Sequence, residues 1–468
     1  MRKLLLMDKY HIPLYDGIRA EEGSAVQRTY APAKPAAPVL RPDQPWESSQ
    51  LGYVSMRVEN GLYRVWYEAF DLASTNDCEC RLCYAESTDG EHWVKPKLGI
   101  CEYNGSKDNN IVIDVNLTDG LGIHGHSIFI DPTAPEEARY RCVFQGVLNR
   151  VDGRDGFVVK MSFAYSPDGI HWQHGMPELP RHFLSYPITS FGSDTQCSVF
   201  WDPDYKKYVG YFRSAHRTGA RSIGRCETAN MENWPVPHMI LTPDHADPRL
   251  TDYYNNGATR YTSDGDTAYL LFYSPFSHET DKCWVRVAVS RDGVCFDRID
   301  RGVFIGNDQP YDKGMAFVGP GVWDVGNGES AIAYIGGSWN HSGESDPAKK
   351  VGGVVLLKFP KDRIVGLETD DFYNFCTVGR VDPENPEVCV NAVVRGRLRA
   401  GLIRDDAFIP GFSPDDCEPL TGDLRDARFT WKGSAGPVPK AEDEDDSEAV
   451  LKLFLEDGII FSVTVNHL

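Results

Sequence analysis

The sequence has no excess of positive charge and no long apolar run. Its 48 lysines and arginines are outnumbered by 68 aspartates and glutamates, which gives a formal net charge of −20 at pH 7. Nucleic-acid binding needs clustered basic side chains that displace counterions, and because no such cluster is present we expect no nucleic-acid partner. No stretch approaches the roughly 20 apolar residues of a membrane span, and only four apolar residues separate the basic start from Asp8, too few for a signal peptide. We therefore expect a soluble, cytoplasmic protein without a membrane partner.

Spacings typical of metal sites are also scarce. The 12 cysteines are scattered through strand-like contexts, where a small apolar side chain suffices, and a chain of this length does not need disulfide bonds. The cluster of Cys78, Cys80 and Cys83 has no second matching pair and no closely spaced histidine. We interpret it as a reduced hairpin with buried thiols rather than a zinc site, and we expect no metal and no cofactor.

Helical periodicity is absent between the apolar segments, whereas turn residues are plentiful. The 468 residues include 43 glycines and 30 prolines, and 12% of them are aromatic. This composition favours an all-β fold with many turns. A chain of this length exceeds one ordinary hydrophobic core, so we expect two domains.

One short phrase recurs between strand-like segments. It combines Ser or Thr, then Asp-Gly, then a bulky aromatic residue three positions after the glycine. The copies read YAESTDGEHW at 84–93, YSPDGIHW at 165–172 and VSRDGVCF at 289–296, with a degenerate ETANMENW at 227–234. Asp-Gly between strands favours a tight turn because glycine tolerates a positive φ. A repeated turn predicts a repeated structural unit.

A second kind of hairpin recurs five times, at intervals of 61 to 73 residues. Each copy is a short apolar strand, a polar turn and an aromatic-rich returning strand, and the copies begin at residues 53, 126, 197, 258 and 321. Each interval accommodates four strands, an inner pair and an outer pair; for the fifth unit we expect VGGVVLLKF and RIVGLE as the outer pair. Five such units predict a five-bladed β-propeller over residues 41–361.

The character of the chain changes after the fifth hairpin. Residues 362–468 alternate apolar and polar residues in short strands without a further copy of either phrase, which predicts a β-sandwich. Residues 1–40 are interpreted as an N-terminal extension.

Polar residues just upstream of the inner hairpins are the candidate site, because loops that enter the inner strands of a propeller converge on one mouth. Acidic and histidine side chains at these entries are Glu47, His124, His126, Asp194, Asp252 and Asp312. Three of the acids, Glu47, Asp252 and Asp312, stand 12 residues before their hairpin turns. Carboxylates that face a common pocket suit glycosidic bond cleavage, with one as general acid and another as nucleophile or base.

Other residues near these entries are candidates for contacts with a sugar. Trp46, Tyr254 and Trp339 can stack on sugar rings, although such rings are equally typical of a propeller core. His124 and His126, two positions apart, lie on one face of a strand and belong with His341. They can orient a hydroxyl of the substrate, act as a general acid or flank a cation. Alternatively, they are polar residues of the channel whose hydrogen bonds are all made within the protein.

A five-unit propeller followed by a β-sandwich, with acids at the blade entries, resembles the furanosidase-type glycoside hydrolases of families 32, 43 and 68. The phrases YRVWYEAF, EYNGSKDNNIV, DPTAPEEARYRCVF and SRDG resemble a branch with a family 32-like amino-terminal domain, from about residue 40 to the end. The resemblance implies a furanoside substrate. The chain departs from family 32 in having PWESSQ in place of an Asn-Asp-Pro-Asn motif, and FWDPDY and RCET match the Arg-Asp-Pro and Glu-Cys motifs in letters only.

The sequence therefore predicts a glycoside hydrolase with a carbohydrate substrate, a small oligosaccharide or a glycoside such as a fructosyl or arabinosyl furanoside. Glu47, Asp194 and Asp312 are the expected catalytic carboxylates, supported by Asp252 and His126. Two alternatives stay open. The first is a phosphorylase, whose phosphate would be held by the basic side chains of Arg213, His216, Arg217 and Arg221. The second is a carbohydrate-binding propeller without catalytic activity.

Overall fold

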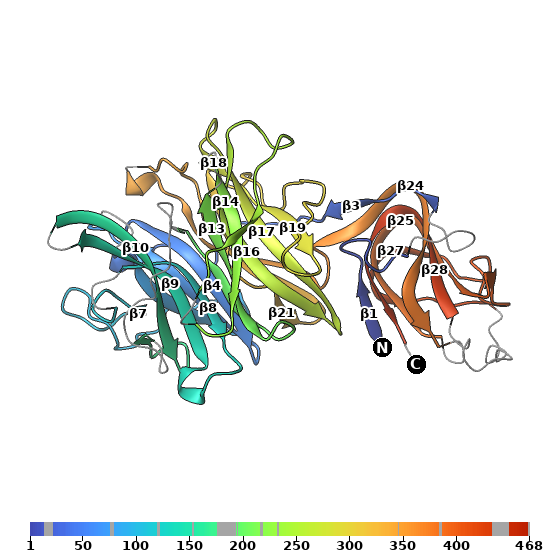
Figure 1. Ribbon diagram of the computed structural model, residues 1–468, viewed down its shortest axis with the longest axis horizontal. Coiled ribbons are helices and arrows are strands. Elements are labelled where there is room, and N and C mark those ends of the chain that lie inside the picture. The colour runs from blue at the N-terminus through green and yellow to red at the C-terminus, as the bar shows by residue number, and fades with distance from the viewer. Residues whose placement is uncertain are drawn as a thin grey trace.

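The computed structural model describes the chain except for residues 14–21, 75–78, 119–121, 152–153, 176–192, 194, 216–218, 232–233, 345, 383–385, 433–448 and 467–468. Five four-stranded antiparallel sheets and one eight-stranded sheet account for its strands. The described helices are three short 3-10 turns, η2 (Pro45–Glu47), η4 (Glu136–Ala138) and η5 (Pro347–Lys349). The predicted all-β, five-bladed propeller is confirmed (Figure 1).

Each blade is built from strands that follow one another in the chain. The first contains β4 (Gln50–Glu59), β5 (Leu62–Phe70), β6 (Arg81–Ser87) and β7 (Ile111–Ile113). The second contains β8 (Gly122–Ile130), β9 (Tyr140–Val151), β10 (Arg154–Ser166) and β11 (Gln173–His174). The third contains β12 (Ser198–Asp202), β13 (Lys207–Ala215), β14 (Arg221–Thr228) and β15 (His238–Leu241). The fourth contains β16 (Thr251–Ser263), β17 (Asp266–Ser277), β18 (Lys282–Cys283) and β19 (Arg286–Ser290), and the fifth β20 (Met315–Val318), β21 (Trp323–Gly326), β22 (Glu329–Gly337) and β23 (Gly352–Pro360).

The fifth blade differs from its prediction. VGGVVLLKF forms β23 as expected, but RIVGLE begins β24 (Val365–Val381), where Val365 pairs with Thr29 in the C-terminal sheet. The inner strand of this blade is instead divided into β20 and β21, which both pair with β22. The interruption falls around Pro320, which has no N–H to donate to a neighbouring strand.

The inner strands approach one another closely around the axis, so glycine stands at the contacts. A Cβ on Gly257 would lie 2.7 Å from the Val318 carbonyl oxygen, and one on Gly319 would lie 2.1 Å from that of Val54. The ring closes where the segment before the first blade pairs with the fifth, because Leu40 and Val354 exchange backbone hydrogen bonds. A shared apolar core between these two blades completes the closure.

The repeated Asp-Gly phrase has the same hydrogen bonds in its three full copies. The hydroxyls of Ser87, Ser166 and Ser290 each accept the N–H of the glycine three residues later at 2.9 Å. The aspartate carboxylate then accepts the two N–H groups that follow the glycine. Local side-chain bonds of this kind make the turn independent of its surroundings, which explains why the phrase is legible in the sequence.

These turns also hold neighbouring blades together. The Gly169 carbonyl of the second blade accepts the Trp66 indole N–H of the first at 2.6 Å, and the Gly293 carbonyl of the fourth accepts the Tyr211 hydroxyl of the third at 2.7 Å. Lys358 of the fifth blade donates to the Asp89 carbonyl of the first at 2.7 Å. The phrase therefore attaches each blade that carries it to the preceding blade of the ring.

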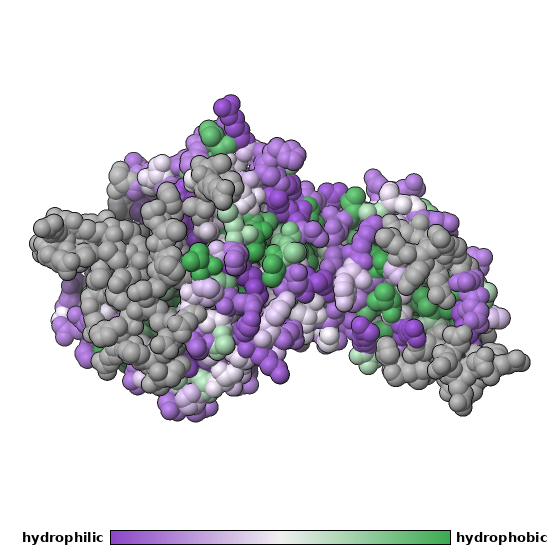
Figure 2. Space-filling model, in the orientation of Figure 1, coloured by the Kyte–Doolittle hydropathy of each residue, from purple (hydrophilic) through white to green (hydrophobic). Residues whose placement is uncertain are grey.

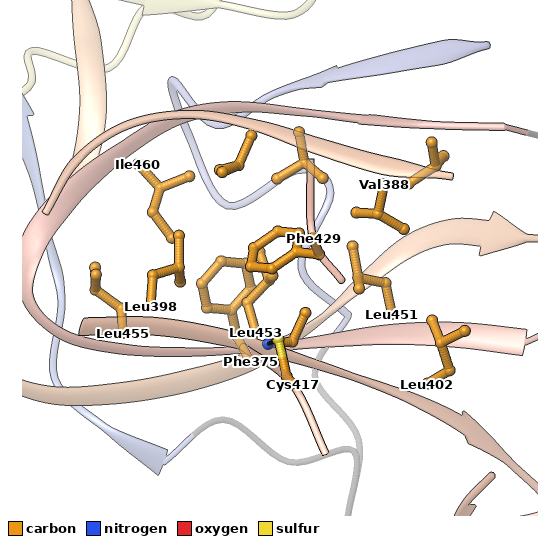
Figure 3. Close-up of a cluster of buried hydrophobic side chains, with 14 of the residues drawn as sticks. Phe375, Val388, Leu398, Leu402, Cys417, Phe429, Leu451, Leu453, Leu455 and Ile460 are labelled. Atoms are coloured by element: carbon orange, nitrogen blue, oxygen red, sulfur yellow. Dashed lines mark hydrogen bonds between the residues drawn. The ribbon is translucent and has the colours of Figure 1, made fainter. Parts of the chain in front are cut away.

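The C-terminal sheet consists of three long strands with shorter ones at their edges. The long strands are β24, β25 (Val388–Arg404) and β28 (Ala449–Val465), and the shorter ones are β1 (Arg2–Leu5), β2 (Glu22–Gly23), β3 (Val26–Thr29), β26 (Ala407–Phe408) and β27 (Leu420–Arg428). The register of β24 and of β25 against β28 shifts at the same level, between Gly458 and Glu456. The sheet bends there around its core, so that Ile460 and Leu453 of one strand lie on opposite sides of the cluster (Figure 3).

The first residues of the chain join this C-terminal sheet. β1 pairs with β28, and β2 and β3 pair with β24, so part of the segment expected as an extension supplies edge strands. Beside the propeller, buried Asp362 accepts a hydrogen bond from Tyr261 at 2.6 Å and pairs with Lys3 at 2.9 Å. This contact ties the first strand of the chain and the segment between β23 and β24 to the fourth blade.

Within the described part of the chain, no helix has the length and hydropathy needed to cross a membrane. On the side of the molecule shown in Figure 2, the described residues are mostly hydrophilic, with smaller apolar groups between the polar ones.

The blade contact of the Asp-Gly phrase can be tested with two alanine substitutions. Gly169 and Gly61 both have a positive φ, 77° and 79°, but a Cβ on Gly169 would lie 2.7 Å from the Trp66 ring, whereas one on Gly61 would meet nothing within 4 Å. We expect Gly61→Ala to lower the free energy of unfolding by about 1 kcal/mol and Gly169→Ala by about 2–4 kcal/mol, because the second adds a steric clash to the same backbone strain. Urea denaturation measures both values, and equal losses would contradict the assigned contact.

Candidate active site

A cavity of about 270 Å³ lies where the inner strands of four blades begin. Residues near the starts of β4, β8, β16 and β20 contribute to its wall. The aromatic lining consists of Tyr53, Phe70, Tyr254, Phe317 and Trp339, and the polar lining of Gln50, Glu68, His124 and His341. Four of the residues expected to contact a sugar, His124, Tyr254, Trp339 and His341, are therefore brought together at the propeller mouth.

Glu68 is the carboxylate of this cavity. Its side chain is buried on β5, and each oxygen has a partner: Oε1 accepts the Gly125 N–H at 2.6 Å and lies 3.3 Å from His126 Nδ1, while Oε2 lies 3.0 Å from His124 Nδ1. Burial alone would raise the pKa of Glu68, but the bonds and charges of the two histidines outweigh it and lower the pKa to about 2. Glu68 is therefore ionised at neutral pH.

A bulge at Gly125 aims both histidines at this carboxylate. The register of β8 against β9 shifts between His124 and Ser127, and Gly125 has a φ of 62°. A Cβ at Gly125 would lie 2.3 Å from the Thr195 carbonyl oxygen, so only glycine fits. Both ring nitrogens of His126 face acceptors, since Nε2 lies 3.2 Å from the Trp66 carbonyl oxygen.

Two arginines stand beside cavity-lining Tyr254, although they are not themselves among the residues that line the cavity. The guanidinium groups of Arg213 and Arg221 lie 4.8 Å and 5.3 Å from the Tyr254 ring centroid, within the range of cation–π contact. The His341 ring is 4.8 Å from the same ring. Burial lowers the pKa of Arg213; burial, followed by the charge of Arg221, lowers that of His341, which is therefore neutral near pH 7.

Asp252 is the partner of one of these arginines. Its Oδ2 pairs with Arg221 at 2.7 Å and with His278 Nε2 at 2.9 Å. It is not among the residues that line the cavity, but Arg221 connects it to Tyr254, which is. Asp194, His216 and Arg217 lie outside the described residues.

Glu47 and Asp312 do not line the cavity, contrary to our expectation. Glu47 is buried, accepts the Tyr67 hydroxyl at 2.6 Å and pairs with Lys95 at 2.6 Å. Asp312 is equally buried, accepts the Tyr334 hydroxyl at 2.9 Å and pairs with Lys34 at 2.7 Å. Their common offset in the sequence reflects a common structural bond, in which an entry carboxylate holds a tyrosine of its blade's second strand.

Two other predicted residues also lie away from the lining. Trp46 donates its indole N–H to Asn110 at 2.9 Å and packs edge-on against Tyr103, a position in the core of the first blade. His126 is buried behind Glu68 rather than exposed to the cavity. Its contribution is to the charge and orientation of Glu68.

Sequence reasoning missed Glu68 although its signal was present. Glu68 is the acidic residue of YRVWYEAF, a strand otherwise dominated by aromatic and aliphatic side chains, and a carboxylate in such a strand must be buried with a partner. The sequence also contained no sign that Cys80 approaches a histidine, because His124 lies in the next blade. Ligand atoms of Glu68, Cys80 and His124 all lie within 4.8 Å of one another, so these three residues form a group, within the part of the chain that the structure describes, that could hold a metal ion. Cys78 lies outside the described residues.

Comparisons with known proteins show similarity only at the level of solved structures. No protein-family model and no curated protein matches the chain, so the resemblance to families 32, 43 and 68 stays a prediction. A glycosyl hydrolase from Bacteroides ovatus is 17% identical, with a TM-score of 0.49 over 71% of this chain and 94% of that one. An N-acetylgalactosamine deacetylase from F. plautii, solved in complex with blood group B trisaccharide, is 12% identical, with a TM-score of 0.46 over 72% and 96% of the two chains.

A third structure comes from the GH130 family of mannoside phosphorylases, which contains glycoside hydrolases that target β-1,2 mannosidic linkages in Candida mannan. It is 17% identical, with a TM-score of 0.45 over 71% of this chain and 93% of that one. Identities and scores this low assign no activity, and the fold stated above rests on the strand pairing.

The depressed pKa of Glu68 predicts a specific loss of stability in acid. Glu68 stabilises the fold while it is ionised, so this contribution is present above its ordinary pKa of 4.5 and is lost as the pH falls toward 2. Between these values we expect the free energy of unfolding to fall more steeply in the wild type than in Glu68→Gln, by up to about 3 kcal/mol. Urea denaturation at a series of pH values measures both slopes, and because the other carboxylates titrate in both proteins, parallel slopes would contradict the prediction.

Proposed function

We propose that the chain is a carbohydrate-active enzyme that cleaves a glycosidic bond of a small saccharide in the mouth cavity. The observation that carries this proposal is the pairing of ionised Glu68 with His124, 3.0 Å apart, on the wall of a cavity otherwise rich in aromatic rings. Aromatic side chains offer apolar faces with polar edges, which suit a sugar ring. A carboxylate beside an imidazole supplies the charge and the proton transfer that the cleavage requires.

The two side chains take different roles in this proposal. The transition state of glycoside cleavage resembles an oxocarbenium ion, and Glu68, with a pKa of about 2, carries the negative charge that stabilises it. A group with so low a pKa cannot donate a proton at neutral pH. We assign proton transfer to His124, since an imidazole changes its charge near physiological pH.

Most glycosidases use a second carboxylate, and two residues are candidates for it here. Asp252 stands behind Tyr254, held by Arg221 and His278. Asp194, which directly precedes Thr195 in the chain, remains a candidate from the sequence. Thr195 itself bonds the hydroxyl of Tyr53 at 2.8 Å, and Tyr53 lines the cavity.

The size of the cavity favours a short substrate. Its volume of about 270 Å³ is at the lower limit of the roughly 300–1,000 Å³ found for small-molecule sites. One or two sugar rings at the end of an oligosaccharide, or a simple glycoside, suit it better than the interior of a polymer. Fructosyl and arabinosyl furanosides, which the family resemblance implies, are included in the proposed substrates together with pyranosides.

A panel of aryl furanosides and pyranosides tests the proposal. We expect Glu68→Gln to lower kcat/KM on the best substrate by about 10²–10⁴-fold, because it removes the charge that stabilises the transition state. Glu47→Gln is the matched control: it replaces a buried glutamate of the same blade that lies off the cavity, and we expect it to retain activity within a few-fold when it is folded.

Three results would change the assignment. Full activity in Glu68→Gln would move the chemistry to another residue. A loss in Glu47→Gln as large as that in Glu68→Gln, with both variants folded by circular dichroism, would support the original sequence prediction. Saccharide binding by calorimetry without cleavage of any panel member would indicate a binding propeller.

A phosphorylase is the second candidate, favoured by the two arginines beside Tyr254. Arg213 and Arg221 both stand on the ring of cavity-lining Tyr254, and paired guanidinium groups bind phosphate well. Phosphate would then replace water as the acceptor. Hydrolysis predicts the same rate of glycoside cleavage with and without inorganic phosphate and no sugar 1-phosphate by ³¹P NMR. Cleavage that depends strictly on phosphate would establish the phosphorylase instead. In that case Arg221→Ala should raise the KM for phosphate at least about tenfold.

A further inference from the structure

We propose that Glu68, Cys80 and His124 form a Zn²⁺ site on the wall of the mouth cavity. One ligand atom from each of the three residues lies within 4.8 Å of the other two, and all three side chains are buried. Glu68 and His124 also line the cavity, so an ion held by this triad borders the space in which a ligand would bind.

Strand pairing explains how three distant residues meet. Glu68 on β5 lies directly opposite Leu82 on β6, and Cys80 stands two residues before Leu82, on the same face of the sheet. His124 comes from β8 of the next blade, and its Nδ1 lies 3.0 Å from Glu68. The first and second blades thus contribute two ligands and one ligand respectively.

The chemistry of the three donors selects the ion. A carboxylate oxygen, a thiolate sulfur and an imidazole nitrogen are the three donor types that zinc uses in proteins. Ca²⁺ and Mg²⁺ take oxygen ligands, so a cysteine and a histidine argue against them. With metal–ligand distances of about 2.0–2.3 Å, tetrahedral donors stand roughly 3.3–3.8 Å apart, and the separations found here come into that range with small side-chain movements.

Three protein ligands leave one of four tetrahedral positions for water or a bound molecule, as in zinc sites that act on substrates. The Cys80 thiol donates a hydrogen bond to the Ile123 carbonyl oxygen. Zinc binding replaces that S–H bond with an S–Zn bond and releases the thiol proton to solvent. The reaction is a simple exchange of a proton for the ion, with no oxidant or reductant.

The surroundings of Glu68 resemble an outer coordination shell. Its Oε1 is held by the Gly125 N–H at 2.6 Å and by His126 at 3.3 Å, and His126 is in turn oriented by the Trp66 carbonyl. Such bonds orient a ligand carboxylate before the ion arrives. Oε2, which lies 3.0 Å from His124 Nδ1, is the oxygen that Gly125 and His126 do not hold.

The neighbouring Cys83 supplies a matched control. It lies opposite Tyr67 on β5, one position from Glu68, and therefore faces the other side of the sheet. It is as fully buried as Cys80, but it packs in the core shared by the first and fifth blades, whereas Cys80 packs in the core shared by the first and second. Substitution of either thiol removes one buried sulfur from the same blade, and only one of them is a ligand.

The test uses the full-length protein after dialysis against a chelator, with no saccharide present. ZnCl₂ titration followed by elemental analysis should give one zinc per chain. CoCl₂ should produce a near-ultraviolet thiolate-to-cobalt charge-transfer band. We expect Cys80→Ser to abolish the band and, like His124→Asn, to weaken zinc binding by more than about 100-fold, while Cys83→Ser keeps both the band and the affinity.

Thermal denaturation separates loss of a ligand from loss of the fold. Zinc should raise the midpoint of the wild type and of Cys83→Ser, but not those of Cys80→Ser and His124→Asn, each first shown to unfold cooperatively without metal. A cobalt band retained in Cys80→Ser, or zinc binding by the wild type no tighter than that of both ligand variants, would overturn the site. Since no readout involves catalysis, failure of the zinc site and failure of the proposed glycosidase activity are distinguishable. The roles given above to Glu68 and His124 in glycoside cleavage apply to the metal-free protein, because a zinc-bound imidazole nitrogen no longer transfers a proton.

Discussion

The close approach of five inner strands around one axis is the constraint on which the rest of the propeller depends. At the contacts between these strands a Cβ would fall 2.1–2.7 Å from a neighbouring carbonyl oxygen at Gly125, Gly257 and Gly319. Glycine alone permits that distance. At Gly125 the same requirement produces a bulge and a positive φ, and this bulge directs His124 and His126 onto Glu68. The packing of the ring thus shapes the site directly.

The buried acids of the propeller differ mainly in the partners that they meet. Glu47 pairs with Lys95 and Asp312 with Lys34, and a lysine partner is a fixed cation that ties one segment to another. Glu68 instead meets two imidazoles. Histidine exchanges protons near neutral pH and binds metals, and this difference in partners is the reason that we propose chemistry at Glu68 and structural roles for Glu47 and Asp312.

Several features were predictable from the sequence because they are encoded within a few residues. The Ser-x-Asp-Gly turns are closed by their own side chains, as at Ser166 and Asp168. The five hairpins are likewise recognised by short strands and polar turns that are contiguous in the sequence. His124 and His126 were expected on one face because residues two apart in a regular strand share a face, but the bulge at Gly125 interrupts that alternation, and it is the bulge that brings both rings to Glu68. The choice between Glu47 and Glu68 was not predictable in this way, because both are glutamates of the first blade and both are buried.

The sequence by itself determined the number of repeating units and the chemistry of their turns, because turn geometry and strand alternation depend on neighbours along the chain. Only the tertiary structure decided which carboxylate faces the cavity and which cysteine approaches a histidine. Glu68, Cys80 and His124 are separated by up to 56 residues. They meet because strand pairing brings Cys80 near Glu68 within the first blade, and because the second blade packs against the first through a shared core. Contacts of that kind depend on how sheets are packed against one another, which no local pattern of residues records.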